Sequence, residues 1–410
     1  MGKTGTRAGY VGDMSDAQLQ AAYASGGGFG VFAYYTNGSG YNSASSAPNF
    51  MWNQKVTYNA GPWTYSPVKY WPNETANGVV DQNSASSTGG ADKLSFFAYA
   101  PFADKVTLGT TDYTLDPATG LFQDTSSNDY YGQSGATGIT KYTSNATNGD
   151  PKVYFSLPAD PKNTNTVDLL WGVAPSSASY TIAQSSTVQS ITEGMPNIDL
   201  TKQTVTENIE FLFKHALAKV TFTVEGVFDE VSAGSNAGDS NTKIVVESVS
   251  IPTTFPQKGI LNLNNTIAGV PLWTADGAGT ATIDVANSDL LAGIKYDGTT
   301  DTYGGQPTGV TTSPQALLAD SKYYMLIPTT ANLPITITYH VFTNDANLAG
   351  GFSKVTNVIT KTISSLALEG GKAYTINLQL GMTTVKFNAT VGAWGTGSTT
   401  TVDLPINVAP

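Results

Sequence analysis

Few residues of this 410-residue chain are of types that carry out catalytic chemistry. The chain has no cysteine, which excludes thiol nucleophiles, disulfides and cysteine-ligated zinc. Its two histidines, His215 and His340, have neither a serine nor a cysteine triad context in the sequence. His215 lies beside aromatic residues and is expected to make a structural hydrogen bond, whereas His340 alternates with threonines and is expected to face solvent.

Carboxylates are the other candidates, because a pair of them is what glycoside hydrolysis requires. The chain has 31 Asp and Glu residues, but none stands in a recognisable acid/base motif. Many lie in turn-like segments such as 124–129 and 297–301, and the sequence contains no Asp-x-Asp-x-Asp-Gly calcium loop. We therefore predict that these aspartates form turns, that the protein is not an enzyme, and that it has no catalytic residue, metal site or cofactor.

An aromatic group near residue 65 could stack on sugar rings. Its members are Trp63, Tyr65, Tyr70 and Trp71. Packing inside a β-structure is the interpretation that the residue types favour, because aromatic side chains fill such interiors. A glycan-contacting surface is the alternative.

Arg7 is the only arginine of the chain, and the other 19 basic residues are lysines. A protease pocket that grips a planar guanidinium would therefore cut the chain at one place only. Small neighbours and a position near the N-terminus make the bond between Arg7 and Ala8 accessible. We consider this bond a processing site, with residues 1–7 as the remnant of a leader; chance retention of one arginine is the alternative.

The C-terminal segment 399–410 has the pattern of a strand with one apolar face. Its alternating apolar side chains are Val402, Leu404, Ile406 and Val408. Such a segment suits strand addition, in which backbone bonds give affinity and successive side chains give register. At about 1.5–3 kcal/mol per buried side chain, four would contribute roughly 6–12 kcal/mol before ordering entropy is subtracted. A native last strand of the C-terminal domain is an equally open alternative.

Composition and charge restrict the fold class and the partners. Charged residues make up only 12% of the chain, and its polar residues are largely Thr, Ser and Asn together with 42 Gly, which favours strands and turns over long helices. The net charge of −11 leaves no cationic footprint, so nucleic acid is excluded as a partner. No run of 18 apolar residues is present in the sequence. We predict an all-β protein.

The elements expected along the chain are many short strands after one short helix. The helix spans residues 16–24 behind Ser15 as its N-cap. A long loop with one or two short strands is expected over 102–150. The apolar phase of segment 209–224 shifts by one residue, which indicates a bulge or bend near 216–218. We place two β-sandwich domains at 1–185 and 186–410.

Five segments resemble the Bacteroidetes fimbrillin family, the type V pilins and their minor subunits. They are 29–35 (FGVFAYY), 63–72 (WTYSPVKYWP), 94–101 (LSFFAYAP), 213–222 (FKHALAKVTF) and 370–378 (GGKAYTINL), the last with Trp394 soon after it. The segments occur in the order of the family and span most of residues 29–394. Segment 213–222 is the most specific of them.

The resemblance implies two tandem transthyretin-like β-sandwiches, export as an outer-membrane lipoprotein precursor, and assembly into a cell-surface fimbrium. It also implies that an arginine-directed protease removes an N-terminal strand, and that the groove left behind accepts a strand from a neighbouring subunit. The lipidated cysteine that it implies is not in this chain.

The function expected from residues and resemblance together is a structural fimbrial subunit that polymerises by strand exchange and supports adhesion. Its expected partners are other fimbrial subunits and the protease. The alternative is a tip adhesin, or a surface protein that binds a host or microbial glycan or protein, on the same fold.

Overall fold

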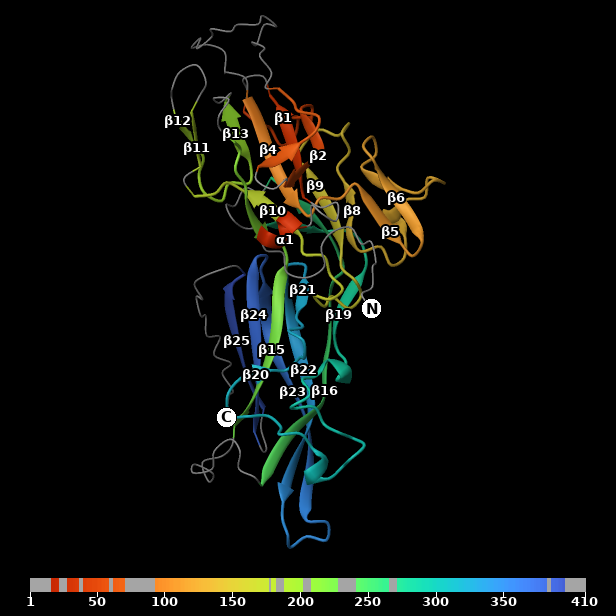
Figure 1. The fold of residues 1–410 in the computed structure, drawn as a ribbon, viewed down its shortest axis with the longest axis vertical. Helices are drawn as coiled ribbons and strands as arrows, with labels where there is room; N and C mark the ends of the chain where they lie inside the picture. Colours follow the sequence, from red (N-terminus) through yellow and green to blue (C-terminus); the bar gives the residue numbers. More distant parts are fainter. Residues whose placement is uncertain are drawn as a thin grey trace, which may run out of the picture. The chain divides into compact units, whose positions relative to one another are not determined.

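The structure is a computed structural model of the chain. It describes residues 16–21, 28–36, 40–58, 62–70, 93–176, 178–181, 188–201, 208–227, 241–264, 271–381 and 385–394. These residues fold almost entirely into antiparallel β-sheets (Figure 1), which confirms the all-β class. One short helix, α1 (Asp16–Ala21), begins where the sequence places it. No helix among the described residues is long and apolar enough to cross a membrane.

The chain divides into two compact units that are interleaved along the sequence. The first unit comprises Met1–Pro158, Asn165–Leu217 and Gln257–Gly279, and the second comprises Ala159–Thr164, Ala218–Pro256 and Thr280–Pro410. The domains expected at 1–185 and 186–410, and their transthyretin-like topology, stay predictions.

One sheet of the first unit, here called the β1 sheet, is built around the apolar segments near residues 30 and 97. Its strands are β1 (Phe29–Tyr35), β2 (Met51–Tyr58), β3 (Trp63–Tyr65), β4 (Lys93–Ala100), β10 (Leu170–Val173), β13 (Ile198–Thr201) and β14 (Leu212–His215). They run in the order β14-β10-β4-β1-β2-β3, with β13 also paired to β4. Strands β1, β2 and β4 lie side by side (Figure 1).

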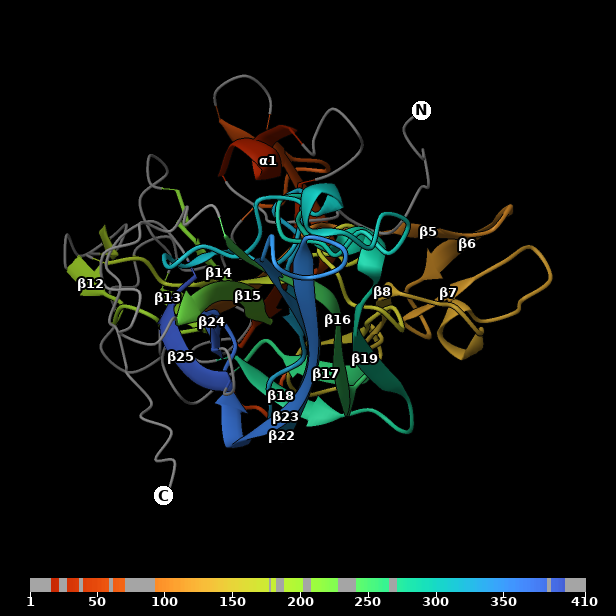
Figure 2. The same ribbon diagram turned by 90° about the horizontal axis from the view of Figure 1, so that it is seen from below.

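The other seven-stranded sheet of this unit is here called the β9 sheet. Its strands are β5 (Lys105–Leu108), β6 (Thr111–Asp116), β7 (Leu121–Gln123), β8 (Gly138–Tyr142), β9 (Lys152–Ser156), β17 (Lys258–Asn262) and β18 (Leu272–Ala275). They run in the order β18-β17-β9-β8-β7-β6-β5, and β5, β6 and β7 follow one another as a meander (Figure 2). A small hairpin of β11 (Ser179–Thr181) and β12 (Val188–Ser190) completes the unit.

The expectation of a long loop over 102–150 is wrong, because β5 to β8 lie within it. The strands are short and their connections are tight turns. Gly109 and Gly120 hold positive φ angles of 62° and 75° in two of these turns. The aspartates do form turns, as predicted: Asp124 Oδ1 accepts from the amides of Ser126 and Asn128 at 2.8 Å. Not all of these strands were predicted, because closely spaced turn residues leave too few positions between them for an alternating apolar pattern to show.

The two sheets of the first unit face each other across a layer of aromatic side chains. Tyr99 of β4 and Tyr142 of β8 come from different sheets, and their hydroxyl groups lie 2.7 Å apart with both side chains fully buried. The Tyr142 hydroxyl donates to the Ala103 carbonyl at 3.0 Å, and the Tyr99 hydroxyl donates to Asn53 Oδ1. Burial raises the pKa of both tyrosines well above the ordinary value. The hydrogen bonds satisfy polar groups that would otherwise be costly to bury.

The second unit also has two sheets around one core. The first consists of β15 (Ala218–Val227), β20 (Gln315–Ala316), β21 (Tyr324–Leu326), β24 (Lys372–Gly381) and β25 (Val385–Ala393). The second consists of β16 (Thr242–Pro256), β19 (Thr280–Val285), β22 (Thr329–Asn344) and β23 (Phe352–Leu368). β15 and β24 are parallel. Two 3-10 turns are described in this unit, η3 (Asn287–Asp289) and η4 (Tyr303–Gly305), and one in the first unit, η1 (Tyr130–Gly132).

The phase shift predicted near residues 216–218 marks a change of sheet. β14 ends at His215 and pairs with β10 in the first unit, whereas β15 begins at Ala218 and pairs with β21 and β24 in the second. The two residues between them, Ala216 and Leu217, are completely buried. The inward face therefore switches because the chain passes from one core to another.

The structure bears differently on the predictions for the two histidines. His215 Nδ1 lies 2.8 Å from Asp168 Oδ2, and the Asp168 side chain is completely buried. The prediction that His340 faces solvent is wrong, because only 4% of it is exposed. His340 does stand on the outward face of β22, but the Tyr296 ring covers it at a centroid distance of 4.1 Å. An alternating strand pattern cannot show that a distant loop covers the outward face.

The site of His340 disfavours the protonated ring. Burial, and then the charge of Lys354, lower its pKa below the ordinary value of 6.5, while the hydrogen bond of Nε2 to Glu247 Oε2 at 2.8 Å opposes the shift. Tyr296 and Asp301 also face this region, and Lys354 Nζ bonds to both. The unfolded chain therefore binds a proton more readily here than the folded chain.

We expect acid to weaken the second unit through His340. Because the folded-state pKa is depressed, this contribution to stability is complete above the unfolded value of 6.5 and is lost as the pH falls from there through the lower folded-state pKa. The melting temperature of the protein should fall as the pH is lowered across this range, and it should fall less in the His340→Gln variant. Equal pH dependence of the variant and the parent protein would contradict the assignment.

We expect Tyr142→Phe to destabilise the first unit by about 1–3 kcal/mol, because it removes the buried hydrogen bond to the Ala103 carbonyl and the hydroxyl contact with Tyr99. Urea unfolding followed by near-UV circular dichroism measures the change. Tyr113→Phe is the matched control, since Tyr113 is also buried and its hydroxyl has no hydrogen bond among the described residues. An unchanged unfolding midpoint for Tyr142→Phe would rule out the network as a stabilising element.

Candidate functional site

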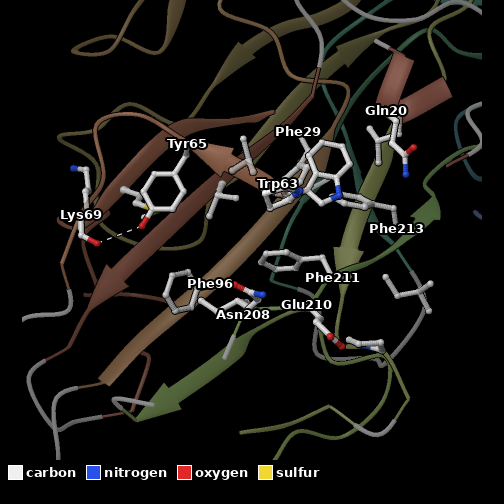
Figure 3. Close-up of a pocket in the computed structure, with 18 of the residues that line it drawn as sticks. Gln20, Phe29, Trp63, Tyr65, Lys69, Phe96, Asn208, Glu210, Phe211 and Phe213 are labelled. Atoms are coloured by element: carbon white, nitrogen blue, oxygen red, sulfur yellow. Dashed lines mark hydrogen bonds between the residues drawn. The ribbon is translucent and has the colours of Figure 1, made fainter. Parts of the chain in front are cut away.

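An apolar pocket of about 750 Å³ opens on the outer face of the β1 sheet, and Figure 3 shows its lining. This face is turned away from the β9 sheet, because Phe96 lines the pocket whereas Tyr99 of the same strand contacts Tyr142 of β8. Side chains of α1, β1, β2, β3 and the segment 208–213 line it. Leu19 of α1 is 5% exposed at its wall, so the short helix is held by packing and not by its own helical propensity.

The wall of the pocket is largely aromatic. The Phe29 ring contacts Trp63 at a centroid distance of 5.0 Å and Phe213 at 5.1 Å, and Phe211 lies at 6.1 Å. Figure 3 shows Phe29, Trp63, Phe211 and Phe213 grouped together, and Tyr65, also part of the lining, on the side of Lys69.

A glycine makes room for the ring of Phe211, which comes directly before β14. A Cβ atom on Gly172 of β10 would lie 2.8 Å from the Ala98 Cβ and 3.0 Å from the Phe211 ring. Both distances are shorter than ordinary contacts, so Gly172 and Ala98 form a shallow floor beneath Phe211. Phe211 can therefore lie across the sheet and close one end of the pocket.

Polar groups stand at the margin of the pocket and do not form a catalytic arrangement. Lys69 and Glu210 appear on different sides of the view in Figure 3. The Tyr65 hydroxyl donates to the Lys69 carbonyl at 3.3 Å, and the Glu210 amide donates to the Tyr180 hydroxyl at 3.3 Å. Such a site suits the binding of apolar side chains, with charges available at its edges.

Among the described residues, no group of three His, Asp or Glu side chains could hold a metal ion. The lining of the pocket likewise contains neither histidine nor serine as a nucleophile or base. Its composition is that of a binding surface.

The predicted aromatic group is divided by the structure. Trp63 and Tyr65 line the pocket, whereas Tyr70 is 86% exposed. Trp71 lies outside the described residues, as do Arg7 and Ala8 at the predicted cleavage site. The four side chains of the predicted donor segment, Val402, Leu404, Ile406 and Val408, also lie outside them.

The sequence reasoning missed Phe29, Phe96 and Phe211 as parts of a site. The sequence did contain a signal for a covered outer face, since β1 and β4 are apolar at successive positions and not only at alternate ones. Strands apolar on both faces need cover on both sides. The sequence could not show that residues 208–213 supply part of that cover, because this depends on pairing between distant segments.

Comparison with known proteins gives one sequence relative and a shared fold. No protein-family model matches the chain. Over 85 residues, 20% of the chain, it is 36% identical to the fimbrium subunit Fim1C of Phocaeicola vulgatus, and the match spans only 18% of that protein's length.

The crystal structure of a fimbrial protein from Bacteroides vulgatus superposes with a TM-score of 0.59 at 19% identity, covering 95% of this chain and 99% of that one. The chain is therefore similar in sequence to a fimbrium subunit over one segment and shares its fold with a fimbrial protein over nearly its whole length, which confirms the resemblance to the Bacteroidetes fimbrillin family.

Proposed function

We propose that this protein is a structural fimbrial subunit that polymerises by strand exchange at the bacterial surface. The observation that carries the proposal is the aromatic pocket of about 750 Å³ on a sheet that is apolar on both faces. The likeness to a fimbrium subunit and to the fold of a fimbrial protein supports the biological setting.

The occupant of the pocket is the segment 399–410 of a neighbouring subunit. In an extended strand the side chains of Val402, Leu404, Ile406 and Val408 recur every two residues, about 6.6–6.8 Å apart. Aromatic walls such as Phe29, Trp63 and Phe213 suit side chains of this size. Pro405 has no amide hydrogen, so its position must face away from the acceptor strand.

Cleavage after Arg7 is the step that prepares the chain for assembly. An arginine-directed protease would separate residues 1–7 from Ala8 and the remaining chain, which includes α1 at the wall of the pocket. The partners are then the protease and other fimbrial subunits. Export proceeds through an outer-membrane lipoprotein precursor, and the assembled fimbrium supports adhesion.

We expect the protein to form linear polymers once it has been clipped after Arg7 and concentrated. Deletion of residues 399–410 should abolish polymers, because the segment supplies the donated strand. Arg7→Ala should resist the protease and remain monomeric. Size-exclusion chromatography and negative-stain electron microscopy measure both outcomes. Polymers formed equally well by the deletion variant would refute the role of the tail.

We also expect complementation between two different defective variants. Trp63→Glu should damage the acceptor and leave the donor intact, while Leu404→Asp with Ile406→Asp should do the reverse. Each variant alone stays monomeric, and their mixture forms dimers that cannot extend. Val358→Glu, at a site 65% exposed in the second unit, is the matched control and should polymerise normally. Polymers formed by Trp63→Glu alone would show that the pocket is not the acceptor.

A further inference from the structure

The outer face of the β9 sheet combines lysines and tyrosines. On β9, Val153 and Phe155 are buried towards the core, so Lys152 and Tyr154 point outward, and both are half-buried. Strands β8 and β17 pair with β9 on its two edges. Lys141 of β8 is opposite Tyr154 of β9, and Lys258 is the first residue of β17. We call the residues Tyr131, Lys141, Lys152, Tyr154 and Lys258 the Lys–Tyr face.

Contacts between the side chains hold this face together. The ammonium group of Lys141 lies 4.9 Å from the centre of the Tyr154 ring and 5.5 Å from that of Tyr131. The ammonium group of Lys258, on β17, lies 5.7 Å from the centre of the Tyr131 ring. The two rings meet edge to face at 5.9 Å and 88°. Two ammonium groups therefore converge on a pair of aromatic rings.

The orientation of Tyr131 is fixed by an acid. Its hydroxyl donates to Asp276 Oδ1 at 2.8 Å, and burial together with this bond raises its pKa to about 12. The hydroxyl is therefore neutral at physiological pH and remains a hydrogen-bond donor. Thr274 on β18, opposite Ile260 of β17, adds a hydroxyl near the same face.

The lysines of this face lack the partners that other lysines of the protein have. Lys105, Lys322 and Lys354 each pair with a carboxylate at 3.5 Å or less. Within the described part of the chain, no carboxylate lies at ion-pair distance from Lys141, Lys152 or Lys258. In a protein with a net charge of −11, three such lysines lie on one sheet, with Asp276 as the carboxylate bound to Tyr131 beside them.

We propose that the Lys–Tyr face binds an acidic polysaccharide. On binding, the ammonium groups turn from the tyrosine rings to carboxylate or sulfate groups of the sugar, and the flat apolar rings are then open for sugar rings to stack on. The Thr274 hydroxyl at the margin can bond to sugar hydroxyls. The face is too small, and the whole protein too acidic, for nucleic acid.

This proposal does not depend on strand exchange, so it is tested on the intact, unclipped monomer. The probes are heparin as a sulfated chain, polygalacturonate as a carboxylated chain, dextran as a neutral chain and poly-glutamate as an acidic chain without sugar. Binding is measured by biolayer interferometry at low and at physiological salt. We expect binding to one or both acidic polysaccharides, no binding to dextran, and at least tenfold weaker binding to poly-glutamate.

The variants separate this face from general electrostatics. Lys141→Ala with Lys258→Ala should weaken binding at least tenfold, and the corresponding arginine pair should retain it within about threefold. Lys295→Ala with Lys361→Ala makes the same change of charge in the second unit and should alter binding less than twofold. Thermal unfolding confirms that each variant is folded. Tyr154→Leu keeps both lysines and should also weaken binding, because the stacking ring is lost.

Three results would overturn the proposal. The first is that neither acidic polysaccharide binds at low salt. The second is that the two alanine pairs lose affinity equally. The third is that poly-glutamate binds as tightly as the polysaccharides, which would identify an acidic peptide as the better ligand.

Discussion

A sheet with two apolar faces is the constraint on which the first unit depends. In an ordinary sandwich only the inner face of a sheet must leave water. Here β1 and β4 are buried on both faces, with Tyr99 directed towards the β9 sheet and Phe96 directed away from it. The outer face must therefore be covered by other parts of the chain or by another molecule. Helix α1, the β11–β12 hairpin and the segment 208–213 cover part of it, and the aromatic pocket is where that cover ends.

The sequence predicted the fold class because strand composition and turn residues are local properties. Segments such as 29–35 and 94–101 read as buried strands, and β1 and β4 occupy them. The bend near Ala216 was also predictable, since a change of core reverses the inward phase. The cause of the bend was not predictable from the sequence. It depends on β14 pairing with β10 and β15 pairing with β24, and both partners are distant in the chain.

The candidate site was predictable only in part for the same reason. Trp63 and Tyr65 stand out by their type, but Phe29 and Phe213 come together from segments more than 180 residues apart. His340 shows the opposite failure, because its strand pattern indicates solvent while Tyr296 from another segment covers it. Periodicity reports which face of a strand a residue occupies. It does not report what covers that face.

The two proposed binding surfaces of the first unit lie on opposite outer faces of its pair of sheets. The pocket opens from the β1 sheet, and the Lys–Tyr face is on the β9 sheet, while the inner faces are joined through Tyr99 and Tyr142. A strand donated by a neighbour would therefore occupy one face and leave the other accessible. Because the lysines need only be accessible to bind an acidic polysaccharide, each subunit of a polymer would keep its own site. Repetition along a fimbrium would then convert weak individual contacts into avid attachment.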